Sequence, residues 1–149
     1  MNKEYIILEL IPTASNPDKG SIIQISALKI NGLKLLDRFD YRLNYDKLPI
    51  LEMKSWIDYD INSFNYVDSS DEMLSKFSSW SNGLPILVLD NIYTPLYLRD
   101  LENNIEFIYD YLNMEYSTDI IDKIIDKYHL EPSNYIVDLL YEALIYHFK

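Results

Sequence analysis

Hydrophobic residues gather in short runs along the chain, and the spacing within each run predicts a strand or a helix. The first run, Glu4–Thr13, is almost continuously apolar and rich in β-branched residues, which is typical of a strand covered on both faces. One carboxylate, Glu9, lies inside it. Because an unpaired buried charge is costly, we expect Glu9 to lie at the open end of the strand or to be left from a site that once held a cation.

Two more strands are predicted after a loop at residues 14–20. Apolar and polar residues alternate along Ser21–Ile30, and a second run returns along Leu33–Leu43. The pair Asn31-Gly32 between them favours a type I′ hairpin turn, because both residues tolerate positive φ. The first third of the chain is therefore predicted to be a three-strand meander.

Strands and helices alternate in the rest of the chain, although residues 48–64 have no clear pattern. Ser69 and Glu72 form a capping box that opens a helix, and Asn82-Gly83 ends it. The elements expected after it are a buried strand at Leu84–Leu89, a helix at Thr94–Asn103, a strand or a helix at Ile105–Leu112, a helix at Ser117–Leu130, and a last helix capped by Ser133 or Asn134. This order predicts a single α/β domain over residues 1–149 with a mixed sheet.

The composition limits the cellular location and the classes of binding partner that we expect. Thirteen basic residues face twenty-four acidic ones, for a net charge of −11, so tight binding to phosphate groups is disfavoured and we expect weak nucleic-acid binding. The acidity fits a protein partner with a basic surface, or it serves solubility alone. The absence of cysteine excludes disulfides and thiolate metal sites. With no signal peptide or membrane span recognised, we expect a cytoplasmic protein.

Four stretches match the motifs of one known family. That family opens with a strand carrying Asp-x-Glu and then Thr-Thr-Gly, the place that Tyr5–Thr13 takes here. Its second strand, Ile-Ile-Glu/Gln-Ile-Ala-Ala-Val-Lys, matches Ile22–Lys29, and its Asp-Arg-Phe matches Asp37–Phe39. Its strand ending in Val-Ala-His-Asn matches Ile86–Asn91. The chain thus resembles a DnaQ-like 3′–5′ exonuclease domain, which implies a ribonuclease H-like, exonuclease-type mixed sheet.

The resemblance also implies a metal site, of which several parts are missing. Such exonucleases hold two divalent metals, Mg²⁺ or Mn²⁺, about 4 Å apart, with four acids as oxygen ligands and a histidine or tyrosine as general base. The first acid corresponds to Glu9, but the second falls on Ile11. Asn91 keeps the asparagine of the next motif, whereas Asp90 replaces its histidine. The acid four residues later falls on Pro95.

The family's last motif fits the final helix in two registers. In one register Asp138 takes the last acid and Ser133 the base, and in the other the acid falls on Leu140 and the base on Tyr135. At best two of the four acids remain, so the resemblance implies a dismantled site. Asp138 is also explained as a solvated helix acid, and Asp90 lies where a relocated ligand would be possible.

Fourteen tyrosines are an unusual number for this length. Four of them, Tyr59, Tyr66, Tyr93 and Tyr97, fall around loops that border the former cleft. Tyrosine is enriched at protein-binding hot spots, so these residues are candidates for an interface. A general bias of the chain toward tyrosine is the other interpretation.

Two functions from different classes follow. The first is a catalytically inactive exonuclease-like domain that needs no cofactor and that regulates or inhibits by binding a protein, such as a nucleic-acid-processing one. The second is an active 3′–5′ exonuclease on DNA or RNA with substituted ligands, which would need Mg²⁺ or Mn²⁺. The match to the scaffold does not separate the two functions, because fold alone does not settle activity. The missing acids favour the first function. The oligomeric state is left open.

Overall fold

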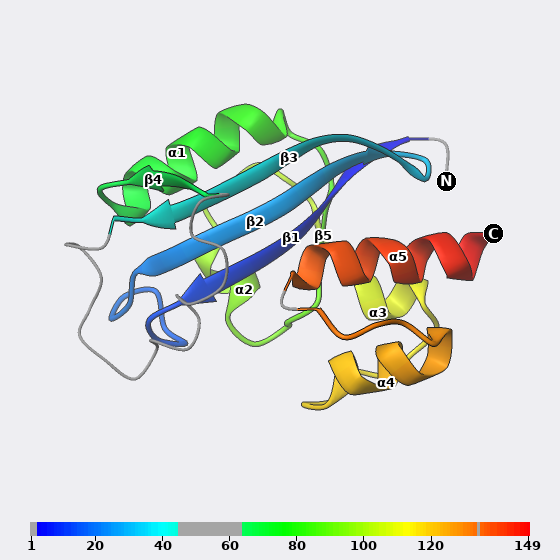
Figure 1. Cartoon of the computed structure of the whole chain (residues 1–149). Helices are drawn as coiled ribbons and strands as arrows, with labels where there is room; N and C mark the ends of the chain where they lie inside the picture. The colour runs from blue at the N-terminus through cyan, green and yellow to red at the C-terminus, as the bar shows by residue number, and fades with distance from the viewer. Residues whose placement is uncertain (1–2, 45–63, 134) are drawn as a thin grey trace.

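The computed structural model describes residues 3–44, 64–133 and 135–149 (Figure 1). Within them, six strands form one sheet in the order β4-β3-β2-β1-β5-β6. The strands are β1 (Glu4–Pro12), β2 (Ile22–Asn31), β3 (Lys34–Leu43), β4 (Asn65–Val67), β5 (Ile86–Val88) and β6 (Ile105–Phe107). The helices are α1 (Ser70–Ser81), α2 (Thr94–Tyr97), α3 (Ile108–Tyr111), α4 (Ile120–Tyr128) and α5 (Ile136–Phe148).

Strand β1 lies inside the sheet, as its apolar run predicts. It pairs antiparallel with β2 and parallel with β5. Ile6 and Ile7, which point to opposite faces, are both completely buried. The meander of β1, β2 and β3 and the parallel β5 confirm the predicted mixed sheet.

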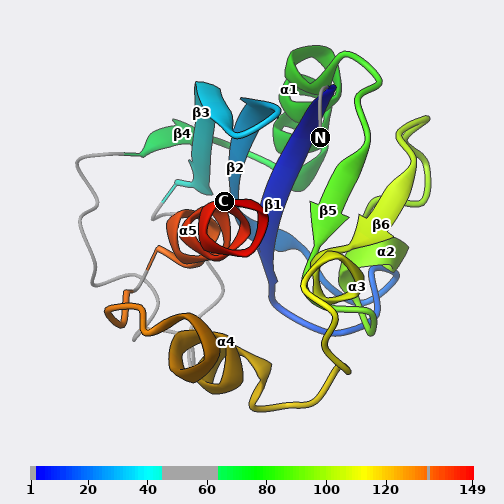
Figure 2. The ribbon, with the colours of Figure 1, turned by 90° about the vertical axis from the view of Figure 1, so that its right-hand side faces the viewer.

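The two faces of the sheet are covered by different helices, and each face has its own core. Figure 2 shows α1 on one side of the sheet and α4 and α5 on the other. On the first side, Met73 and Phe77 of α1 pack against residues such as Leu8 of β1. On the other side, Leu140 of α5 packs against residues such as Ile7 of β1. Two-sided coverage is the reason that β1 shows almost no polar alternation.

The hairpin turn differs from the prediction by one residue. Asn31 pairs with Lys34, so the turn consists of Gly32 and Leu33. Gly32 has φ of 66°, whereas Asn31 and Leu33 are not in the positive region. One positive φ at the first central position is typical of a type II′ turn, and the predicted type I′ turn is wrong. Asn31 is held in the strand because β1 also pairs with it, through Glu4.

The polar residues of β2 do not mark a solvent-facing side, contrary to the alternation in the sequence. Gln24 and Ser26 are 1% and 5% exposed, and the guanidinium-bearing Arg42 of β3 is completely buried. Arg42 donates two hydrogen bonds to Gln24 Oε1, at 3.1 and 2.6 Å, and Gln24 Nε2 donates to Ser26 Oγ at 3.1 Å. The Arg42 guanidinium also lies 4.1 Å from the centre of the Phe64 ring. These contacts offset the free-energy cost of burying Gln24, Ser26 and Arg42.

The helix α1 begins and ends as predicted, with one change at its cap. The hydroxyl of Ser69 accepts a hydrogen bond from Glu72 N–H at 3.1 Å. The Glu72 carboxylate, however, accepts from Asp68 N–H and not from Ser69. Asn82 is in the left-handed region at φ of 50° and ends the helix.

The later elements differ in extent from the predicted ones. The strand expected at Leu84–Leu89 spans Ile86–Val88, and the helix expected at Ser117–Leu130 spans Ile120–Tyr128. The helix expected over Thr94–Asn103 ends at Tyr97, and the side chain of Asn103 binds Leu84 O in the loop before β5. The segment Ile105–Leu112, predicted as a strand or a helix, contains one of each: strand β6 and then helix α3. The last helix begins at Ile136 after Tyr135, with no side-chain cap, so the predicted cap at Ser133 is wrong, and Asn134 lies outside the described residues. Among the described helices, none has the length and apolar character needed to cross a membrane.

A buried tyrosine fastens the loop after β1 to α2. Tyr97 is 7% exposed, and its hydroxyl donates a hydrogen bond to Ala14 O at 2.6 Å. Gly20, at the far end of the same loop, leaves the space that the Tyr97 hydroxyl fills, because a Cβ at residue 20 would collide with it. The loop at residues 14–20 is therefore held against α2 by a tertiary contact.

Tyr97→Phe should lower the free energy of unfolding by about 1 kcal/mol, since it leaves Ala14 O without its donor. Urea denaturation followed by circular dichroism measures the change. The matched control is Tyr146→Phe, because Tyr146 is 57% exposed and we expect no measurable loss there. Equal stability of the two variants would contradict the role given to the Tyr97 hydroxyl.

Candidate functional site

The candidate site lies at the carboxyl ends of β1 and β5. These strands are parallel and pair Leu8 with Val88, so Glu9 of β1 and Asp90 after β5 come to the same end of the sheet. Tyr93 lies close to both acids: burial, and then the charges of Asp90 and Glu9, raise the pKa of its phenol to about 12. The structure thus brings together three of the residues singled out in the sequence.

Glu9 is a half-buried carboxyl on the α5 side of the sheet, the same side as Ile7 and Ile11. Burial raises its pKa to about 7. The described residues provide no hydrogen-bond donor or cation for it. Its neighbour two residues along the same face, Ile11, has no polar atom to share a ligand with it.

Asp90 has a structural task. Its Oδ1 accepts a hydrogen bond from Ile92 N–H at 2.9 Å, and its Oδ2 accepts from the N–H groups of Tyr93 and Thr94 at 2.9 and 2.8 Å. Three backbone donors at the start of α2 therefore occupy this carboxylate, as in a helix cap. Both Asp90 oxygens are engaged before any metal is considered.

Asn91 joins an aromatic cluster. Its Nδ2 donates to the hydroxyl of Tyr109 at 3.2 Å. The Tyr109 ring stacks on Phe107 at a centroid distance of 5.3 Å and lies 5.6 Å from the ring of Tyr116. The asparagine that matches the family motif thus binds a cluster of three aromatic side chains near the end of β5.

Asp138 of α5 is paired with an arginine of β3. Its two oxygens accept from Nη1 and Nη2 of Arg38 at 2.6 and 3.1 Å, and Arg38 Nε donates to Asp40 at 3.2 Å. The second register of the last motif places the acid at Leu140, which is completely buried. In neither register does α5 supply a free carboxylate to Glu9.

The four tyrosines proposed for an interface have different surroundings. Tyr97 is buried and bonded to Ala14, so it is not on the surface in this conformation. Tyr93 and Tyr66 are half-buried, the latter in β4. Tyr59 lies outside the described residues. A protein interface at these tyrosines therefore stays a prediction, and among the described residues it concerns Tyr66 and Tyr93.

Comparison with solved structures identifies the architecture. Product-bound exonuclease I superposes with a TM-score of 0.59 and 12% identity, covering 99% of this chain and 42% of that one. A structure of exonuclease I that suggests how processivity is achieved gives 0.61 and 9%, with 96% and 40% covered. E. coli exonuclease I in complex with a dT13 oligonucleotide gives 0.58 and 10%, with 98% and 40% covered.

The fold is the ribonuclease H-like exonuclease fold. It covers nearly the whole of this chain, which spans about two fifths of the length of exonuclease I. No protein-family model matches the sequence. No curated protein sequence matches it either. The predicted α/β fold class is confirmed, and the likeness carries the fold alone, since identity is 9 to 12%.

The residues at the site do not fit the two divalent metals that this fold holds in active exonucleases. Such ions need several anionic oxygen ligands that face one space. Glu9 is the single carboxylate of the candidate set that is not already bound by protein groups, because Asp90 and Asp138 have backbone and arginine partners. Within the described residues, no three acids or histidines are arranged to hold a metal ion. No catalytic step through a metal follows from this arrangement.

Sequence reasoning missed the partners of the candidate acids. Arg38 was visible as part of Asp-Arg-Phe, but its pairing with Asp138 joins positions 100 residues apart and leaves no local signal. Tyr109 and Tyr116 were likewise visible only as members of a tyrosine-rich chain. Correlated substitution of Arg38 and Asp138 among related sequences is the signal that would reveal this pair.

Glu9→Gln should stabilise the protein in a pH-dependent way. The folded state raises the pKa of Glu9 from its usual 4.5 to about 7, so ionisation costs stability as pH rises through this window. Below pH 4.5 the variant and the parent should differ little, and above pH 7 the variant should gain up to about 3 kcal/mol. Urea unfolding between pH 4.5 and 8 measures this, with the exposed Glu4→Gln as control for loss of charge. A gain that does not vary with pH would contradict it.

Proposed function

We propose that this protein is a catalytically inactive exonuclease-like domain that acts by binding another protein. The observation that carries the proposal is that each remaining candidate acid is diverted from metal binding. Asp90 accepts hydrogen bonds from backbone N–H groups at the start of α2, Asp138 is paired with Arg38, and burial raises the pKa of Glu9 to about 7, so that its charged form is disfavoured. The scaffold of the exonuclease is retained while the ligand set of the metals is not.

The net charge favours a partner with a basic surface. At −11, the approach of a polyanion is opposed by repulsion that reaches about 8 Å at physiological salt. Exposed acids such as Asp122 and Asp126 of α4 give a basic protein complementary contacts. A regulatory or inhibitory role toward a nucleic-acid-processing protein, whose own surface must be basic to bind phosphates, fits this charge.

The protein should show no metal-dependent nuclease activity. A general base is typically worth 10²–10⁴-fold in rate, and metal ligands are missing in addition. The purified protein is incubated with end-labelled single- and double-stranded DNA and RNA in Mg²⁺ or Mn²⁺. Degradation that vanishes in Glu9→Ala would establish the active-exonuclease alternative. Degradation that persists in Glu9→Ala would come from a contaminant.

The protein should also form a salt-sensitive complex with a basic protein. Tagged protein captures its partners from cells, and each captured protein is then purified and titrated alone by calorimetry at 50 to 500 mM salt. We expect a partner of high isoelectric point whose affinity falls at least tenfold over this range, because the long-range attraction is screened. Failure of every captured protein to rebind after purification, or affinity that salt does not change, would count against the proposal.

A further inference from the structure

Strand β6 has backbone groups that no described residue binds. It is the last strand of the sheet (Figure 2) and pairs with β5 alone. Asn104 O accepts from Ile86 N–H at 2.9 Å, so the backbone groups of Asn104 and Glu106 point toward β5. Because these groups alternate along a strand, the N–H and C=O of Ile105 and the N–H of Phe107 point away from the sheet.

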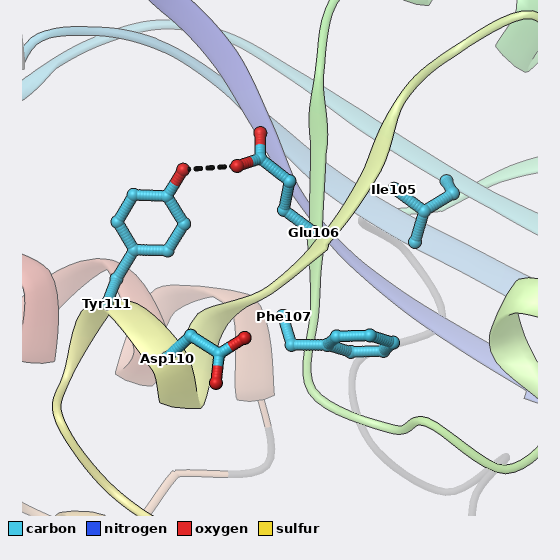
Figure 3. A pocket seen from close by; sticks show the side chains of 5 residues that line it. All are labelled: Ile105, Glu106, Phe107, Asp110 and Tyr111. Atoms are coloured by element: carbon cyan, nitrogen blue, oxygen red, sulfur yellow. Dashed lines mark hydrogen bonds between the residues drawn. The ribbon is translucent and has the colours of Figure 1, made fainter.

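A pocket of about 390 Å³ lies against this edge. It is lined by Ile105, Glu106, Phe107, Asp110 and Tyr111. Figure 3 shows that the Glu106 carboxylate lies on the same side of the strand as Tyr111, that Ile105 and Phe107 project to the other side, and that Asp110 projects from α3 at the end of the strand. The pocket therefore offers acidic and aromatic groups directly beside unpaired backbone.

The two carboxylates have no cation among the described residues. Glu106 Oε1 accepts a hydrogen bond from the Tyr111 hydroxyl at 2.6 Å, and Asp110 is exposed. That hydrogen bond, followed by burial and the charges of Glu106 and Asp110, raises the pKa of Tyr111 to about 12. The negative charges at this edge thus raise the pKa of the Tyr111 phenol beside them.

We propose that β6 and this pocket bind an extended segment of a partner protein, which adds a strand to the sheet and places a lysine or arginine side chain between Glu106 and Asp110. The inference rests on the proposed function, since it names the surface and the partner class of that interaction. Main-chain hydrogen bonds to Ile105 and Phe107 give affinity, and the charged side chain gives specificity, as in other strand-addition complexes.

Charge complementarity selects this occupant over others. A nucleic acid would bring phosphates to Glu106 and Asp110, which repel them. A second copy of this chain carries the same charge of −11, so self-association through this edge is opposed as well. The Tyr111 and Phe107 rings that line the pocket suit the stem of a long basic side chain, which is apolar up to its charged end.

The test uses synthetic peptides of defined sequence. The probe is acetyl-Val-Thr-Val-Lys-Val-Thr-amide, titrated into isotope-labelled protein and followed by NMR and by amide exchange. One comparison peptide replaces lysine with norleucine, which keeps the stem and removes the charge. Another carries N-methyl groups at alternate residues, which blocks backbone pairing without altering the protein.

We expect the lysine peptide to shift the signals of Glu106, Asp110 and Tyr111 and to protect the amides of Ile105 and Phe107 from exchange. The norleucine peptide should bind about tenfold more weakly, and the N-methylated peptide should give no protection. In the double variant Glu106→Gln with Asp110→Asn, the lysine peptide should bind no better than the norleucine peptide.

The matched control is Asp122→Asn with Asp126→Asn in α4, which changes the net charge equally at exposed positions away from the pocket. This variant should bind the lysine peptide within twofold of the parent. An equal loss in both double variants would show that total charge acts and would overturn the site. Absence of any response at β6 with millimolar peptide would also overturn it.

Failure here and failure of the proposed function have different signatures. If a basic partner binds the parent and the Glu106→Gln, Asp110→Asn variant equally, binding occurs elsewhere on the protein and the proposed function stands. If a nuclease activity depends on Glu9, the proposed function fails whatever the peptides do.

Discussion

The burial of β1 on both faces is the constraint on which the rest of the structure depends. A strand that shows water neither face must have a sheet neighbour on each edge and helices above and below. Strands β2 and β5 supply the edges, and α1 and α5 supply the two covers. The same constraint brings the ends of β1 and β5 together, and with them Glu9 and Asp90.

Three carboxylates that belong to the candidate site are each stabilised in a different way. Asp90 receives three backbone N–H groups, and Asp138 receives the guanidinium of Arg38. Glu9 receives neither, and burial shifts it toward the neutral acid. An uncompensated buried charge is costly, so backbone amides stabilise Asp90, an arginine stabilises Asp138, and the pKa of Glu9 rises.

The edges of the sheet carry the interaction surface of the proposed function. An unpaired strand edge is a template for another strand, and β6 is a short one with a pocket of acidic and aromatic residues beside it. Under the proposed function, surfaces of this kind are the means by which the domain acts. Under the same proposal, the net charge of −11 favours partners with a basic surface.

The sequence by itself determined strands β1, β2, β3 and β5 and helices α1, α4 and α5 in outline, because periodicity and side-chain type are local properties. The missing ligands at Ile11 and Pro95 were implied by the resemblance to the exonuclease family. Only the tertiary structure decided the hairpin turn at Gly32-Leu33, where pairing with β1 holds Asn31 in the strand. It also divided Ile105–Leu112 into β6 and α3, since the edge of β5 can pair with three of those residues. The partner of Asp138 and the burial of Gln24 beside Arg42 depend on contacts between distant segments, and no local pattern encodes such contacts.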